Sequence, residues 1–171
     1  MQKTIDFANL SYAQLLFSIC EPQPDQALEK LDDILKRNPK HGFTHILKAQ
    51  AYREKGPSFY IKAIVYFDQA IKFDQQQNGS FYYKFGCFYR YAVGNLANAR
   101  ACFQKSLTQK PNLPASIELV ELSAEAGDVE LATSYLQDGL SITLITRPER
   151  EEGETLDDRI IALKTLLNVP G

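Results

Sequence analysis

Residues 99–111 read ARACFQKSLTQKP, and the spacing inside this stretch decides the fold. Ala99 is followed by Phe103, then by Ser106 and finally by Pro111, at offsets of four, seven and twelve residues. Side chains three or four residues apart lie on one face of an α-helix, so the first three residues predict a helix with one packed face. Pro111 predicts where the helix has ended, because proline cannot continue it.

The same spacing recurs at three other alanines. Ala27 begins ALEKLDDILKRNP, Ala63 begins AIVYFDQAIKFDQ, and Ala132 is followed by Leu136 four residues later, so the intervals between positions 27, 63, 99 and 132 are 36, 36 and 33 residues. Each of these stretches follows another one with helical spacing, at about 6–20, 42–55, 80–93 and 114–126. The separating segments EPQPD, KGPS, VGN and AGD are rich in turn-forming residues, and Asp25 is a candidate helix cap. The pattern predicts helix–turn–helix repeats in tandem.

The third repeat resembles the tetratricopeptide repeat family, whose signature runs W-x2-L-G-x2-Y, then A-x3-F, then P. Residues of matching size stand at these spacings: Tyr82, Phe85, Gly86 and Tyr89, then Ala99, Phe103 and Pro111. The second repeat has a turn two residues longer than the family norm and Gln75 in place of the proline. The resemblance implies an all-α, right-handed α-solenoid, a single domain over residues 1–171 with four repeats at about 6–41, 42–77, 78–112 and 113–146.

A charged segment and a final helical stretch follow the fourth repeat. Residues 147–155 predict a loop, and residues 156–168 return to helical spacing. We expect a C-terminal capping helix that shields the apolar edge of the last repeat, as open-ended helical arrays require. The alternative is an amphipathic helix that docks on a partner.

Charge and composition disfavour several partners. The net charge is -2, from 19 basic and 21 acidic residues, which gives no general attraction to nucleic acid or anionic lipid. No apolar run approaches the roughly 20 residues that span a bilayer. The cysteines are odd in number and widely spaced, at Cys20, Cys87 and Cys102. This pattern predicts reduced, buried thiols and therefore a cytoplasmic protein. Export is the alternative, because an apolar stretch leads to Cys20, but Ile19 stands where a lipoprotein signal needs a small residue.

The sequence offers few parts for catalysis. His41 and His45 are the only histidines, spaced one helical turn apart, with no third metal ligand nearby, so we interpret them as exposed polar residues rather than a metal site. No glycine-rich phosphate loop is present. We therefore expect no metal, no cofactor and no enzymatic activity.

The family resemblance implies a function and a surface. Family members bind a peptide or helix of a partner in a concave groove lined by the first helix of each repeat. The matching positions here are Asn9, Tyr12 and Leu16, then Phe43, Ile46, Gln50 and Arg53, then Tyr83, Cys87, Arg90 and Tyr91, then Ile117, Glu121 and Glu125. The lysine and asparagine clamp for chaperone tails is mostly absent from the matching positions.

We therefore expect a protein-interaction module, that is, an adaptor, chaperone or assembly factor that holds a segment of another protein. A narrower version is similar to the small secretion chaperones of bacteria, and homodimerisation is left open. The alternative is a structural oligomerisation subunit, which would join a larger complex through apolar outer surfaces of the first or fourth repeat.

Overall fold

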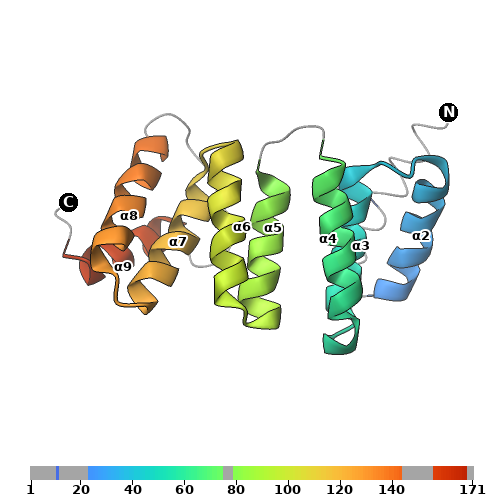
Figure 1. Ribbon diagram of the computed structural model, residues 1–171, viewed down its shortest axis with the longest axis horizontal. Helices are drawn as coiled ribbons and strands as arrows, with labels where there is room; N and C mark the ends of the chain where they lie inside the picture. Colours follow the sequence, from blue (N-terminus) through green and yellow to red (C-terminus); the bar gives the residue numbers. More distant parts are fainter. Residues whose placement is uncertain (1–10, 12–22, 75–78, 144–155, 169–171) are drawn as a thin grey trace. The chain divides into compact units, whose positions relative to one another are not determined.

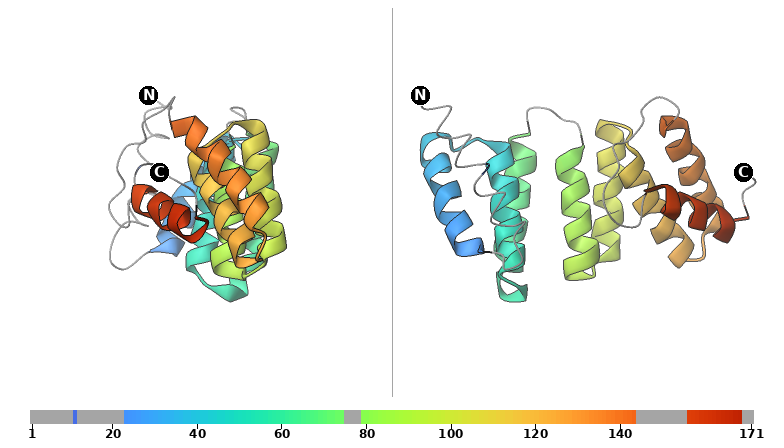
Figure 2. Two further views of the ribbon diagram at one scale, coloured as in Figure 1. Left: turned by 90° about the vertical axis from the view of Figure 1, so that its left-hand side faces the viewer. Right: turned by 180° about the vertical axis from the view of Figure 1, so that it is seen from behind.

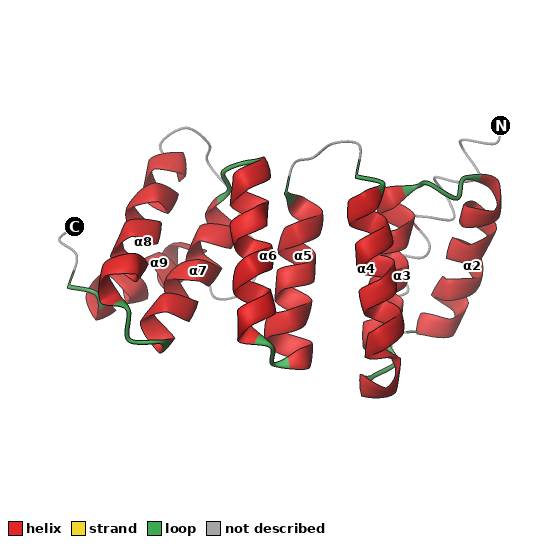
Figure 3. Ribbon diagram, viewed as in Figure 1, coloured by secondary structure: helices red, strands yellow, loops and turns green. Residues whose placement is uncertain are grey.

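The computed structural model describes residue 11 and residues 23–74, 79–143 and 156–168 (Figure 1). Within these ranges every regular element is a helix (Figure 3). The elements are α2 (Pro24–Arg37), α3 (Gly42–Glu54), the 3-10 turn η1 (Pro57–Phe59), α4 (Tyr60–Lys72), α5 (Ser80–Cys87), the π-helical segment η2 (Phe88–Val93), α6 (Leu96–Gln109), α7 (Leu113–Glu125), α8 (Val129–Thr143) and α9 (Leu156–Leu166). None of the helices in these ranges is long and apolar enough to cross a membrane.

The helices form two compact units. Unit 1 comprises residues 1–77 with 91–94 and holds α2, α3 and α4, whereas unit 2 comprises residues 78–90 with 95–171 and holds α5 to α9. The helix predicted at about 6–20 and the loop predicted at 147–155 lie outside the described residues, apart from Ser11. The single domain predicted over residues 1–171 stays a prediction.

The four anchor alanines occupy equivalent places in the second helices. Ala27, Ala63, Ala99 and Ala132 each have no exposed surface, and they begin the buried faces of α2, α4, α6 and α8. A methyl group is small enough to let the neighbouring helix approach closely, which explains why alanine recurs at this position. The predicted helix pairs are therefore confirmed for every repeat whose two helices are described.

Unit 1 is built on two helix contacts, α2 with α3 and α3 with α4. Ala27, Leu31 and Ile34 of α2 form a buried cluster with Leu47 of α3. The cap predicted at Asp25 is wrong, because α2 already begins at Pro24, which places Asp25 inside its first turn. The Asp25 carboxylate instead pairs with Lys55 at the end of α3.

The longer turn of the second repeat folds into η1. Gly56 precedes it with φ of 95°, a left-handed conformation that glycine adopts without strain. Pro57 then begins the 3-10 turn, where its missing N–H is not needed. The two extra residues are thus absorbed between α3 and α4 without shifting Ala63 from its buried position.

The third repeat also has one residue more than the family spacing between Tyr89 and Ala99. The structure absorbs it in η2, where the helix widens and the Asn95 N–H donates to the Tyr89 carbonyl oxygen at 2.9 Å. Single-turn π segments commonly mark an inserted residue in an α-helix. Both ends of the repeat therefore keep the predicted register.

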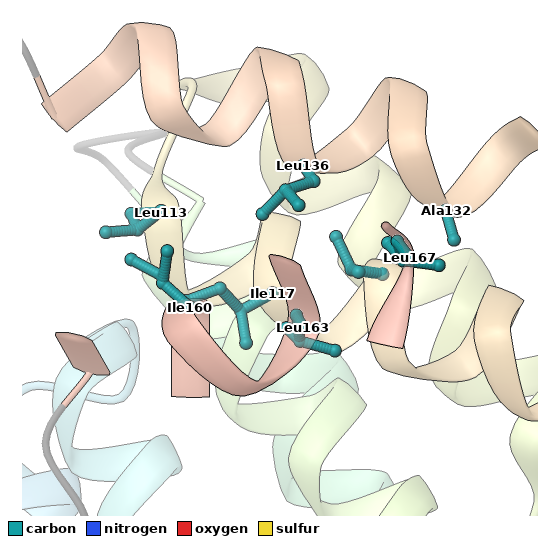
Figure 4. Packing of buried hydrophobic residues seen from close by; sticks show 8 residues of the cluster. Leu113, Ile117, Ala132, Leu136, Ile160, Leu163 and Leu167 are labelled. Atoms are coloured by element: carbon teal, nitrogen blue, oxygen red, sulfur yellow. The ribbon is translucent and has the colours of Figure 1, made fainter. Parts of the chain in front are cut away.

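Unit 2 ends in a three-helix contact. Leu113, Ile117 and Val120 of α7 pack with Ala132 and Leu136 of α8 and with a row from the C-terminal segment, namely Ile160, Leu163 and Leu167 (Figure 4). Seen from behind, α9 crosses in front of α7 (Figure 2). The predicted C-terminal helix therefore packs on its own chain, as the capping interpretation requires.

Gly86 provides a test of this packing. A Cβ at Gly86 would lie 2.5 Å from a ring carbon of the fully buried Phe103. Replacing glycine by alanine inside a helix normally stabilises it by about 1 kcal/mol. We expect Gly86→Ala instead to lower the free energy of unfolding by about 1–3 kcal/mol, the cost of overpacking a core, measured by urea denaturation. Unchanged or raised stability would contradict this close approach.

Candidate functional site

The predicted site residues of unit 1 divide by burial. Phe43 is half-buried against the cluster around Leu47, and Ile46 is fully buried, so Ile46 serves the core rather than a partner. Gln50 is half-buried and Arg53 is exposed, which leaves these two available on α3. Tyr12 lies outside the described residues.

The opposite side of α3 carries polar residues where the family signature is apolar. If the signature of the second repeat is aligned from Ala63 backwards, allowing for the two extra residues in the turn, His45, Lys48 and Tyr52 fall at its W, L and Y positions. The fully buried Ala49 falls at the glycine position. Lys48 has only 4% of its surface exposed, its Nζ donates to Tyr66 at 2.8 Å, and it is paired with Asp32. Sequence reasoning missed this cluster, although the counting could have found it.

Lys48 stays charged because its partners compensate for burial. Burial by itself lowers the pKa of Lys48, but the hydrogen bonds that its ammonium donates to Asp32 and Tyr66 outweigh this effect, and the pKa lies above its ordinary value. The ammonium also lies 4.3 Å from the centre of the Tyr66 ring, where the electron-rich face attracts a cation. Lys48 therefore joins α2, α3 and α4 within unit 1.

The histidines have separate structural positions. His41 caps α3, its Nδ1 accepting from the Thr44 N–H at 3.3 Å. His45 has 7% of its surface exposed and donates from Nε2 to the Pro39 carbonyl oxygen at 2.8 Å. The interpretation of both as exposed polar residues is thus wrong for His45. Burial, reinforced by the charges of Lys48 and His41, lowers the pKa of His45.

A cavity of about 600 Å³ opens beside His45 and Lys48, between α2, α3 and α4. Its wall carries both charges, because Asp32 and Asp33 line it together with Lys36 and Lys48. Most of these charges are already paired, Lys36 with Asp33 at 3.0 Å and Lys48 with Asp32. The part of the chain that the structure describes contains no group of three or more metal-ligating side chains.

In unit 2 the predicted groove residue Arg90 is the centre of an ion-pair cluster. Its guanidinium donates to Glu118 and Glu121 at 2.8 Å each and to Glu125 at 2.6 Å, and its side chain is only 9% exposed. Arg159 of α9 donates to Glu121 at 2.7 Å and to Glu118 at 3.2 Å. We call these five residues the Arg–Glu cluster. Arg90 and Glu121 were both predicted on one surface, and the structure brings them together.

The Arg–Glu cluster changes the interpretation of Arg90. A side chain that is nine-tenths buried and bonded to three carboxylates joins η2 to α7. It is not an exposed anchor for a partner. Glu118, at 2% exposed, and Arg159 were missed by sequence reasoning.

Tyr83 and Cys87 are partly buried against a core cluster that contains Ala99 and Phe103. Burial, followed by the charge of Glu118, raises the pKa of the Cys87 thiol to about 11. Burial also raises the pKa of Tyr83 above its ordinary value. Cys87 is therefore protonated near neutral pH and is a poor nucleophile, because the thiolate is the reactive form. Tyr91 is exposed.

The face of α7 that was predicted to bind a partner is covered by α9. Ile117 is 1% exposed and packs with Ile160 and Leu163, while Glu121 is bonded to Arg159. Glu125 keeps about half of its side-chain surface in contact with solvent. A helix with a cation and a row of apolar side chains therefore already occupies this face.

The lowered pKa of His45 gives a pH dependence. As pH falls below 6.5, the unfolded chain protonates before the folded chain, so the stability held above pH 6.5 is progressively lost until the folded pKa is reached. We expect His45→Gln to remove this loss, which amounts to at most about 1.4 kcal/mol per pH unit. Urea denaturation at about pH 7.5 and about pH 5.5 measures it. His41→Asn retains a capping side chain and removes only the smallest of the causes that lower the His45 pKa, so it should keep most of the wild-type slope. Equal slopes in all three chains would contradict the assignment.

The Arg–Glu cluster predicts unequal costs of truncation. Arg90→Ala leaves the buried Glu118 without one of its cations, so we expect the free energy of unfolding to fall by about 3–5 kcal/mol. Glu125→Ala removes a half-exposed partner and should cost less than about 1 kcal/mol. Chemical denaturation compares the two variants. Similar small losses in both would show that Arg90 is not structurally required.

Comparisons with known proteins agree with the geometry. No protein-family model and no curated protein sequence matches this chain. Among solved structures, it is similar to PilW, described as a widely conserved type IV pilus biogenesis factor, with a TM-score of 0.67 and 21% identity over 96% of this chain and 70% of that one. It is also similar to a thermophilic TPR protein of Thermus thermophilus, with a TM-score of 0.61 and 17% identity over 85% of this chain and 74% of that one. With its helix pairs, buried anchor alanines and these neighbours, the chain is a tetratricopeptide-repeat-like protein in fold.

Proposed function

We propose that this protein is an interaction module that binds a helical segment of a partner protein on the first helices of its repeats. The single observation that carries the proposal is the position of α9, which lies on the first helix α7 and covers Ile117. A surface that holds one helix through a row of apolar side chains has the shape and the apolar strip to hold another. The similarity to a pilus biogenesis factor supports an assembly or adaptor role.

A second candidate surface lies within unit 1, on α3. Gln50 and Arg53 lie one turn apart on α3, and the Arg53 guanidinium donates to the carboxylate of the adjacent Glu54. Arginine contributes strongly to interfaces because its guanidinium forms several directed hydrogen bonds. A cytoplasmic location remains a prediction for this module.

A non-catalytic role fits the chemistry of the described site residues. The Cys87 thiol has a raised pKa, and the carboxylates of Glu118 and Glu121 are bonded to arginines. Nucleophilic catalysis by a thiol needs the opposite shift, toward a lower pKa. Holding a partner therefore accounts for these groups better than reacting with one.

One observation favours the second candidate, a structural oligomerisation subunit. Ile61 and Val65 lie one turn apart on α4 and are 79% and 50% exposed. Two neighbouring apolar side chains on an outer helix face favour contact with another chain. Size-exclusion chromatography with light scattering measures the molar mass of the wild-type and Ile61→Asp chains in solution. This candidate requires an assembly in the wild type that the substitution dissociates.

The proposed binding surface predicts a charge-reversal phenotype. We expect Arg53→Glu on α3 to reduce recovery of co-purifying proteins at least tenfold, about 1.4 kcal/mol of binding free energy, because it replaces a donor by a repelling carboxylate. Lys62→Glu makes the same charge change on the second helix α4 and should leave recovery unchanged. Quantitative mass spectrometry after affinity purification measures both. Equal recovery from both variants would exclude the α3 face.

A further inference from the structure

Three observations describe how α9 is held in unit 2. With the residue that follows it, α9 contributes a single row of buried side chains, Ile160, Leu163 and Leu167, to a cluster that also holds residues of α7 and α8, which contact each other directly. Its other side is apolar and open to solvent, with Ile161 62% and Leu166 66% exposed. With 11 residues, α9 is also shorter than isolated helices that are stable in water. Its order therefore depends on the surface beneath it.

The surface beneath α9 needs a cation. Glu118, Glu121 and Glu125 all bond to one guanidinium, that of Arg90. Arg159 adds a second guanidinium on Glu118 and Glu121. Without α9, the arginine bonded to these three carboxylates would be Arg90, and two of the carboxylates, those of Glu118 and Glu121, are little exposed. The apolar side chain of Ile117 would also be uncovered. A replacement must supply both a cation and apolar side chains.

We infer that α9 is a built-in competitor for the α7 face, which a partner helix displaces when it carries an arginine immediately before apolar residues at the spacing of Ile160, Leu163 and Leu167. The inference rests on the proposed function and names the chemistry of its ligand. The competitor is covalently tethered, so it acts at an effective concentration on the order of millimolar. A free helix of equal intrinsic affinity therefore binds the intact chain weakly.

The contacts explain how displacement spares the rest of the unit. Leu113, Ile117 and Val120 of α7 share a cluster with Ala132 and Leu136 of α8, and we expect them to stay packed because α7 and α8 contact each other directly. Arg90 keeps its three carboxylate partners. When a partner helix takes the place of α9, its own apolar side chains and its own guanidinium take over the contacts that α9 made. Little changes elsewhere in unit 2.

The test uses the full chain and a defined probe, a fluorescent peptide of residues 156–168. Leu163→Asp places a charge in the buried row and should release α9, so we expect the peptide to bind this chain at least tenfold more tightly than wild type, by fluorescence anisotropy. Leu166→Asp makes the identical change on the exposed side of the same helix and should bind like wild type. A peptide with Arg159→Glu should bind the Leu163→Asp chain at least tenfold more weakly.

A second receptor and a second readout guard against misfolding of one variant. The full chain with Arg159→Glu should also gain affinity for the wild-type peptide, and circular dichroism should show helical content near wild type in both receptors. In the wild-type chain, hydrogen exchange of α9 amides should be faster than that of α7 and α8 amides. Peptide affinity equal in all chains, or no binding to either folded receptor, would overturn the inference.

Other outcomes separate this inference from the proposed function and from a second copy. If the peptide does not bind but Arg53→Glu still reduces the recovery of partners, only the competitor role of α9 is wrong. If the peptide binds as expected but Arg53→Glu leaves recovery unchanged, only the α3 binding surface is wrong. If the Leu166→Asp chain forms a dimer that the peptide dissociates, then α9 is exchanged between copies, and the intramolecular competitor is wrong.

Discussion

Burial of the Glu118 carboxylate is the constraint on which unit 2 depends. A buried ionised carboxylate costs several kcal/mol unless directed hydrogen bonds and an opposite charge compensate for it. Arg90 and Arg159 supply both, and they come from η2 and α9, on separate parts of the chain. The three helices must therefore meet at one place and in one register. Apolar packing alone would tolerate small shifts of α9 along α7, whereas two guanidiniums bonded to shared carboxylates do not.

Unit 1 meets the same requirement with a different set of residues. Lys48 stands where the repeat signature has a buried apolar residue, and its ammonium is satisfied by Asp32 from α2 and Tyr66 from α4. A leucine there would pack without direction, but a buried ammonium fixes the rotation of all three helices. Tyr66 also stacks between His45 and Tyr52, with ring centres 5.9 Å and 5.4 Å away. The polar cluster is therefore part of the packing of unit 1.

Sequence periodicity predicted the helices well and the roles of polar residues poorly, for a physical reason. Ala63 and Ala99 have recognisable spacings because every copy needs a small residue at the same close contact. Periodicity reports which face a residue occupies, and it does not report what lies opposite. Arg90 was assigned correctly to the face that holds Glu121, yet its burial depends on Glu118, 28 residues away, and on the position of α9. Ile46 was likewise placed on the right helix but proved fully buried.

Stability of the free chain and recognition of a partner make conflicting demands on the α7 face that α9 covers. Stability of the free chain favours a covered Ile117 and a second cation for Glu118, and α9 provides both. Recognition of a partner favours the same surface uncovered. A single buried row of three apolar side chains is a compromise between them, since it is enough to occupy the face through a covalent tether but small enough for a longer helix to exceed. Such a partner would gain most by matching Arg159, because the carboxylates of α7 discriminate against any helix that arrives without a cation.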